Sequence, residues 1–311
     1  MKKIVAAGVA LFLLCGCSSL NKNTVSYQKA KWDASKYYVV AGDGSSKKAA
    51  AQKALENMNK EIASHTLAPA MEFLPDLMAN AAVKKTWRDN ESAGKHYYSL
   101  AVLPRENAQS VLVPTLNELD AQLGGLAQQF STPANPLADL KIAYKMQPLV
   151  EKRKAIDEVY QFVSGVNQPY MPETFAPYKT TLKQKMSTVL VGIEGEGNES
   201  AVMVSYIVSA LNKMGFGVVE YNNPAKVITV KLQTEVDGYY SKKVNGLFWC
   251  TSSAAVSLRD EENEAVFSRF NVSQRAGTTR KADSLYKSMQ AAGEQAAEEV
   301  ATRLENYLKN K

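Results

Sequence analysis

The pattern of apolar and polar residues predicts strands and helices in alternation from residue 37 onward. Residues 37–41 are β-branched and aromatic, which predicts a strand. The residues after it carry apolar positions at helical spacing: Ala50, Ala54, Leu55, Met58 and Ile62. This spacing predicts an amphipathic helix with one buried face. Further along, "VKKTWRDN" and "KHYYSLAVLPR" predict a β-hairpin with residues 90–95 as its loop.

The turn between the first strand and its helix contains two glycines and two serines, "GDGSS". We expect Gly42 and Gly44 to permit a sharp turn, and Ser45 or Ser46 to cap the helix. A phosphate-binding loop is the alternative, but the third glycine of a dinucleotide fingerprint and the spacing of a P-loop are both missing. Asp43 would also repel an anion. The sequence therefore favours a turn and a cap over a phosphate site.

The middle of the chain has helical periodicity interrupted by breakers. Residues 106–130 predict a helix that Gly124 and Gly125 weaken, and "STPANP" marks a boundary. Residues 137–187 then predict a helical hairpin, with a kink or split at Pro148.

The last third of the chain predicts a second α/β domain. A strand "TVLVGIEG" precedes a helix that Asn198 caps and Gly215 ends. Four more strand segments follow, and an alanine-rich helix over residues 284–308 completes the pattern.

The first 16 residues have the layout of an export signal. Two lysines precede an apolar run of eleven residues, 4–14, which is shorter than the ~20 residues of a membrane-spanning helix. "LCGC", ending at Cys17, matches the lipobox pattern and resembles bacterial lipoprotein signals; an ordinary secretory peptide cut nearby is the alternative. The resemblance implies that Cys17 carries acyl chains such as palmitate. By similarity to lipoprotein sorting signals, serine instead of aspartate at position 18 favours the outer membrane.

These patterns together predict an α+β protein with two small mixed α/β domains joined by a helical hairpin. We expect a lipoprotein signal peptide at residues 1–16 and a flexible, lipidated tether at 17–31. The domains are expected at 32–130 and 187–311, with the hairpin linker at 131–186.

The first predicted domain resembles the Lpp-twenty family of outer-membrane lipoproteins. That domain also forms the N-terminal part of the flagellar assembly protein T. The resemblance covers roughly residues 32–115. The matching positions are Ala41, Gly42, Gly44, Ser45, Ala49, Ala50, Ala54 and Leu55. It implies a lipid-anchored protein of the outer membrane. We expect the folded part to face the periplasm.

Composition and motifs point away from nucleic-acid binding and from catalysis. The net charge of +6 is small and scattered, so no nucleic-acid partner is expected. His65 and His96 lack the spacing of zinc ligands, and Cys250 beside Trp249 fits a buried strand position better than a reactive thiol. The acidic segment "EGEGNES" fits a turn better than a cation site. We therefore assign no catalytic, cofactor-binding or metal-binding residue.

Two functions from different classes remain. The first is a non-enzymatic outer-membrane lipoprotein, anchored by membrane lipid through Cys17, that acts as a scaffold or assembly factor for other cell-envelope proteins. The second is a lipid-anchored periplasmic module that binds a small molecule or peptidoglycan in a cleft between the two domains. Aromatic residues in "VDGYYSKKVNGLFW" are candidates for lining such a cleft.

Overall fold

The computed structural model describes residues 22–88, 96–130, 135–171, 178, 180–197, 199–237 and 243–309. Cys17, the hairpin loop 90–95, Asn198 and the tyrosines at 239 and 240 lie outside these ranges. The described chain combines helices with two sheets, which confirms the α+β class. Its elements, in order, are α1 (Val25–Lys29), β1 (Tyr37–Gly44), α2 (Lys47–Ser64), η1 (Ala68–Phe73), α3 (Leu74–Ala79), β2 (Ala82–Arg88), β3 (Tyr97–Pro104), α4 (Arg105–Ala127), α5 (Pro136–Ser164), α7 (Thr181–Thr188), β4 (Leu190–Gly197), α8 (Ser200–Met214), β5 (Gly217–Glu220), β6 (Ile228–Asp237), β7 (Phe248–Asp260), β8 (Ala265–Thr278) and α9 (Lys281–Lys309).

The chain divides into two compact units that do not follow the predicted domain boundaries. Of the described residues, those up to Pro114 and Ala155–Pro169 form the N-terminal unit, and Thr115–Lys154 and those from Tyr170 onward form the C-terminal unit. Helices α4 and α5 are therefore shared between the units, whereas the sequence placed α4 in the first domain and α5 in a separate linker. The reason is that both helices bury apolar side chains along their whole length, so each half joins the core beside it.

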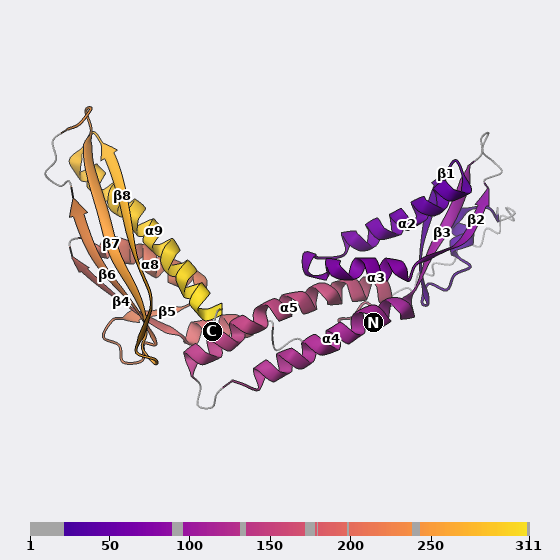
Figure 1. Cartoon of the computed structure of the whole chain (residues 1–311), viewed down its shortest axis with the longest axis horizontal. Coiled ribbons are helices and arrows are strands. Elements are labelled where there is room, and N and C mark those ends of the chain that lie inside the picture. The colour runs from indigo at the N-terminus through magenta and orange to yellow at the C-terminus, as the bar shows by residue number, and fades with distance from the viewer. Residues whose placement is uncertain are drawn as a thin grey trace, which may run out of the picture. The chain divides into compact units, whose positions relative to one another are not determined.

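The N-terminal unit is a three-stranded antiparallel sheet with α2 packed on it (Figure 1). Strands β2 and β3 pair as the sequence predicted, and β3 lies between β1 and β2. The predicted stripe of α2 is confirmed at Ala50, Ala54, Met58 and Ile62, which are fully buried, whereas Leu55 at its edge is only partly buried. Ser46 caps the helix by accepting a hydrogen bond from the backbone N–H of Ala49 at 3.1 Å.

The two glycines of "GDGSS" do not form the sharp turn that the sequence predicted, since both belong to β1. They allow the helix to approach the strand instead. A Cβ atom added to Gly42 would lie 2.1 Å from the backbone nitrogen of Ala54. A Cβ atom on Gly44 would lie 2.8 Å from the backbone nitrogen of Ala50. Glycine is therefore required here for close packing of α2 on β1.

The predicted tether is partly folded, because the short helix α1 occupies residues that the sequence assigned to it. Thr24 caps α1 by accepting from the backbone N–H of Tyr27 at 3.2 Å. The indole Nε1 of Trp87 on β2 donates to the carbonyl oxygen of Asn23 at 2.7 Å. This long-range contact, absent from the local pattern, attaches the polar segment to the sheet of the N-terminal unit.

Helix α5 runs continuously through Pro148, so the predicted split is wrong. Leu140 and Met146 before the proline and Ile156 after it are buried. Since packing anchors the helix on both sides, the lost backbone hydrogen bond does not end it. Helix α4 likewise continues through Gly124 and Gly125 to Ala127.

The C-terminal unit is a five-stranded mixed sheet in the order β5-β4-β6-β7-β8. Strand β4 is parallel to β5 and β6, and β6, β7 and β8 form an antiparallel meander. Helices α8 and α9 pack against each other and against the sheet (Figure 1). Gly215 ends α8 in the left-handed conformation, as predicted. The core lies between these helices and the inner positions of the strands.

A buried carboxylate fixes the beginning of α5 to the sheet and to α9. Asp260 at the end of β7 is fully buried and accepts hydrogen bonds from the Tyr307 hydroxyl at 2.5 Å and the Asn263 amide at 2.7 Å. Lys141 on α5 approaches it at 3.9 Å and donates to the Tyr307 hydroxyl at 3.1 Å. Burial opposes ionisation, but the hydrogen bonds outweigh it and hold the pKa of Asp260 below its usual value. The predicted linker is therefore partly core of this unit.

Candidate functional sites of the C-terminal unit

The histidines and the cysteine that were considered as catalytic or metal-binding candidates lie apart in the structure. His65 follows α2 and stacks on Phe162 with ring centroids 4.0 Å apart. His96 lies 3.4 Å from the carboxylate of Asp43 at the other end of the same unit's sheet. Cys250 is buried on β7 and donates from its thiol to the carbonyl oxygen of Asp237 at 3.3 Å. The buried strand position predicted for this cysteine is confirmed.

The acidic segment at the end of β4 is paired with a lysine. Lys231 on β6 lies 2.9 Å from a carboxylate oxygen of Glu194 and 3.3 Å from one of Glu196. Hydrogen bonding to these two carboxylates raises the pKa of Lys231. The two carboxylates that a cation would need are thus already paired with an ammonium group. Within the described ranges, no group of three or more His, Cys, Asp or Glu side chains is arranged to hold a metal ion.

The face of the sheet opposite α8 and α9 is polar and uncovered by any described element. Along β7 the buried positions Ala254, Val256 and Leu258 alternate with Ser253, Ala255 and Ser257, which are at least partly accessible. Because successive side chains of a strand point to opposite faces, the second set lies on the side away from the helices. The sequence pattern predicted these strands, but it did not indicate that one face of the sheet would stay open.

Small residues at the centre of this open face make it hollow. In one row across the sheet, Ala255 of β7 lies between Gln233 of β6 and Asn271 of β8. In the next row Ser257 lies between Lys231 and Arg269. Two adjoining hollows of about 320 and 500 Å³ follow these rows. We call this surface, defined by Gln233, Ser253, Ala255, Ser257, Arg269 and Asn271, the open sheet face.

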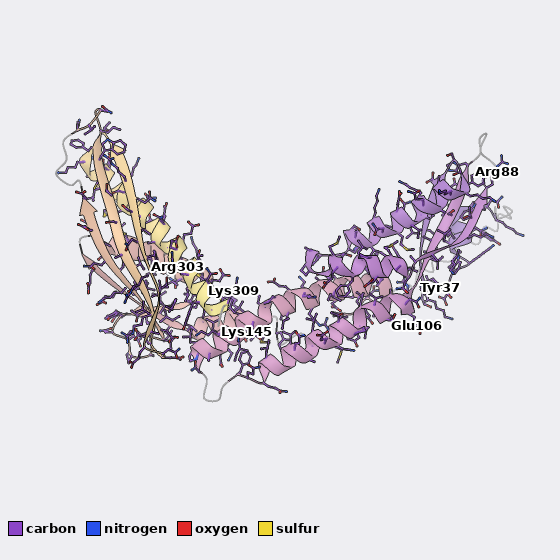
Figure 2. The ribbon with its side chains drawn as sticks, viewed as in Figure 1. Tyr37, Arg88, Glu106, Lys145, Arg303 and Lys309 are labelled. Atoms are coloured by element: carbon purple, nitrogen blue, oxygen red, sulfur yellow. The ribbon has the colours of Figure 1, made fainter. Side chains whose placement is uncertain are left out.

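Positive charge gathers on the β8 side of the open sheet face. Arg269 is exposed, and Arg275 places its guanidinium 4.7 Å from the centre of the Trp249 ring. Arg303 on α9 instead packs on Phe270 from the helical side, at 4.7 Å from that ring (Figure 2). The acidic side chains Glu194 and Glu196 lie on the opposite side, at β4. The face therefore carries amides, hydroxyls and charges of both signs, which suits polar contacts with another macromolecule.

The C-terminal unit has a second concave surface, which we call the methionine pocket. It has a volume of about 610 Å³ and lies between α5, α7 and the end of α8. Its apolar lining consists of Ala143, Met146, Val150, Leu182, Met186 and Met214. The volume falls in the range of ~300–1,000 Å³ that is typical of ligand pockets. No local motif predicted it, because three helices far apart in the sequence contribute its walls.

The polar residues around the methionine pocket include two lysines. Gln147 donates to the carboxylate of Glu151 at 3.0 Å, so these two side chains bind each other. Lys183 and Lys213 are exposed, and neither is paired with a carboxylate of the described chain. A further hollow of about 370 Å³ is lined by Lys145 of α5 and Lys309 of α9, among other residues; both lysines are labelled in Figure 2.

None of the helices in the described part of the chain has the length and apolarity that crossing a membrane requires. The predicted anchor at Cys17 precedes that part and stays a prediction.

Comparison with known proteins adds no family. No family model matches the chain, so the resemblance to the Lpp-twenty family stays a prediction, and no curated protein matches. The chain is similar to the secreted protein HP1454 from Helicobacter pylori at 15% identity and a TM-score of 0.36, over 84% of this chain and 97% of that one.

Two solved lipoproteins resemble parts of the chain. The minor lipoprotein from Acinetobacter baumannii has 7% identity and a TM-score of 0.29, over 39% of this chain and 94% of its own. Rare lipoprotein B from Shewanella oneidensis has 13% identity and a TM-score of 0.27, over 38% of this chain and 95% of its own. These neighbours are named as secreted proteins or lipoproteins. At identities and TM-scores this low, these likenesses carry no inference about function.

Proposed function

We propose that the protein is a non-enzymatic lipoprotein of the outer membrane, held there through an acylated Cys17, that acts on the periplasmic side as a scaffold or assembly factor. The lipobox at residues 14–17 supports the anchor, and two or three acyl chains hold a protein on a membrane stably. One observation carries the scaffold function. The open sheet face is a hollowed polar surface with charges of both signs, and it offers a docking site for another envelope protein.

A site-specific cross-linking experiment in intact cells tests this function. A photo-reactive amino acid replaces Asn271 on the open sheet face and, as a matched control, Gln290 on the helical side of the same unit. We expect Asn271 to give a discrete cross-linked envelope protein and Gln290 to give none. The product should disappear when Cys17→Ser releases the protein from the membrane. A wild-type protein that fractionates as soluble would refute the anchor, and equal cross-linking from both positions would refute the docking face.

A binding module for a small molecule or peptidoglycan is the second candidate function. The methionine pocket is the observation that favours it, because its volume and largely apolar lining match those of ligand sites. A ligand that binds only the folded protein raises its melting temperature in proportion to the logarithm of ligand concentration. Concentration-dependent stabilisation by soluble peptidoglycan fragments would support the peptidoglycan form of this function, and a constant melting temperature would refute it.

A further inference from the structure

The lining of the methionine pocket has the chemistry of a site for a flexible hydrocarbon chain. Met146, Met186 and Met214 approach it from α5, α7 and the end of α8. Methionine is unbranched and polarisable, so a wall of methionines adapts to apolar chains that have no fixed shape. Val150 and Leu182 extend this wall. The pocket also opens to solvent, which leaves room for a polar head group outside the apolar part.

Charge at the rim of the pocket selects the kind of head group. Lys183 on α7 and Lys213 near the end of α8 both line the pocket. Their ammonium groups are exposed and lack a carboxylate partner in the described chain. Among the described residues that line the pocket, Glu151 alone carries a carboxylate, and this carboxylate accepts a hydrogen bond from Gln147. The described lining therefore carries two ammonium groups against one carboxylate, and this balance favours an anionic head group over a cationic one.

From these two observations we propose that the methionine pocket binds an amphiphile with a single acyl chain and an anionic head group. The chain lies against the methionines, and the carboxylate or phosphate contacts Lys183 and Lys213. This inference names the ligand class for the second candidate function and rests on it. It is independent of the open sheet face, which lies on the sheet and shares no residue with the pocket.

The binding experiment uses the full mature chain with Cys17→Ser, purified without detergent. Three probes with the same acyl chain are titrated below their micellar concentrations: palmitate, palmitoyl-lysophosphatidylglycerol and zwitterionic palmitoyl-lysophosphatidylcholine. We expect both anionic probes to bind. The double variant Lys183→Glu/Lys213→Glu should weaken their binding by at least about tenfold while changing the zwitterionic probe little. Comparing the affinities of palmitate and palmitoyl-lysophosphatidylglycerol shows whether the pocket prefers a free fatty acid or a lysophospholipid.

Two further variants distinguish the pocket from unspecific adsorption. Lys287→Glu on α9 makes a charge reversal on an exposed residue that does not line the pocket, and it should leave all three affinities unchanged. Val150→Trp fills the pocket and should abolish binding of every probe while the protein still melts cooperatively.

Two results overturn the proposal: no probe binds the wild-type chain, or the lysine variant binds anionic and zwitterionic probes as the wild type does. Neither result bears on the scaffold function, because cross-linking from Asn271 and membrane fractionation do not involve the pocket.

Discussion

Replacing Gly42 by alanine should destabilise the N-terminal unit far more than an ordinary exchange of glycine for alanine. The new Cβ atom would lie 2.1 Å from the backbone nitrogen of Ala54, 2.5 Å from its Cα and 2.5 Å from the carbonyl carbon of Lys53. These are backbone atoms of α2, so no side-chain rotation relieves the overlap, and the helix must move away from β1. Overpacking of a core costs ~1–3 kcal/mol when side chains can adjust, so we expect at least about 3 kcal/mol here.

Gly125→Ala is the matched control for this substitution. Gly125 lies in α4, is exposed, and has no atom within 4 Å of the added Cβ. The same chemical change there should stabilise the protein by ~0.5–1 kcal/mol, because alanine loses less conformational entropy in a helix than glycine does.

Thermal unfolding followed by tryptophan fluorescence measures both variants. Trp32 and Trp87 report on the N-terminal unit, and Trp249 reports on the C-terminal unit. A loss of about 3 kcal/mol lowers the melting temperature of a unit of this size by roughly 10 °C. We expect that shift in the N-terminal transition of Gly42→Ala. A transition within about 2 °C of the wild type would show that α2 does not pack on β1 as closely as the structure has it.

Three further predictions concern buried groups of the C-terminal unit. Arg153 is fully buried and donates from Nε to the carboxylate of Asp120 at 2.9 Å. Arg153→Met should lower the free energy of unfolding in urea by ~3–5 kcal/mol, because it leaves a buried carboxylate without its cation. Adding Asp120→Leu should restore most of that loss, and an additive double variant would contradict the pairing. The folded-state pKa of Asp260 is depressed below 3.8, so its stabilisation is present above that pH and is lost as the pH falls through the lower folded value. Asp260→Asn should therefore flatten the stability profile below about pH 4, and an unchanged profile would contradict the assignment. Cys250 is 4% exposed; in the mature Cys17→Ser chain a thiol reagent should react only on unfolding, and rapid labelling of the native protein would contradict its burial.

Most of the local structure follows from the sequence. The stripe of α2, the pairing of β2 with β3, the cap at Ser46 and the end of α8 at Gly215 all match their predictions. Each depends on interactions within a few residues or on a strong period, which a single sequence contains. The errors fall where distant segments meet: α1 is held by Trp87, and α5 is held by packing on both sides of Pro148.

The candidate sites divide in the same way. The lipidation motif at Cys17 is a contiguous signal and can be read from the chain alone. The alternation of polar and apolar residues in "KLQTEV", "TSSAAVSL" and "FSRFNVSQ" indicates that each of these three strands has one polar face. The methionine pocket has no such signal, because its residues come from three helices between 143 and 215.

The sequence by itself determined the α+β class, the elements and their amphipathic faces, because apolar periodicity and capping are local properties of the chain. The tertiary structure decided three further features. It assigned α4 and α5 to two units, left one face of the five-stranded sheet uncovered, and brought Lys183 and Lys213 to one pocket. These features depend on which buried faces pack together. That choice is settled by burial and steric fit between segments far apart in the sequence, which no local pattern encodes.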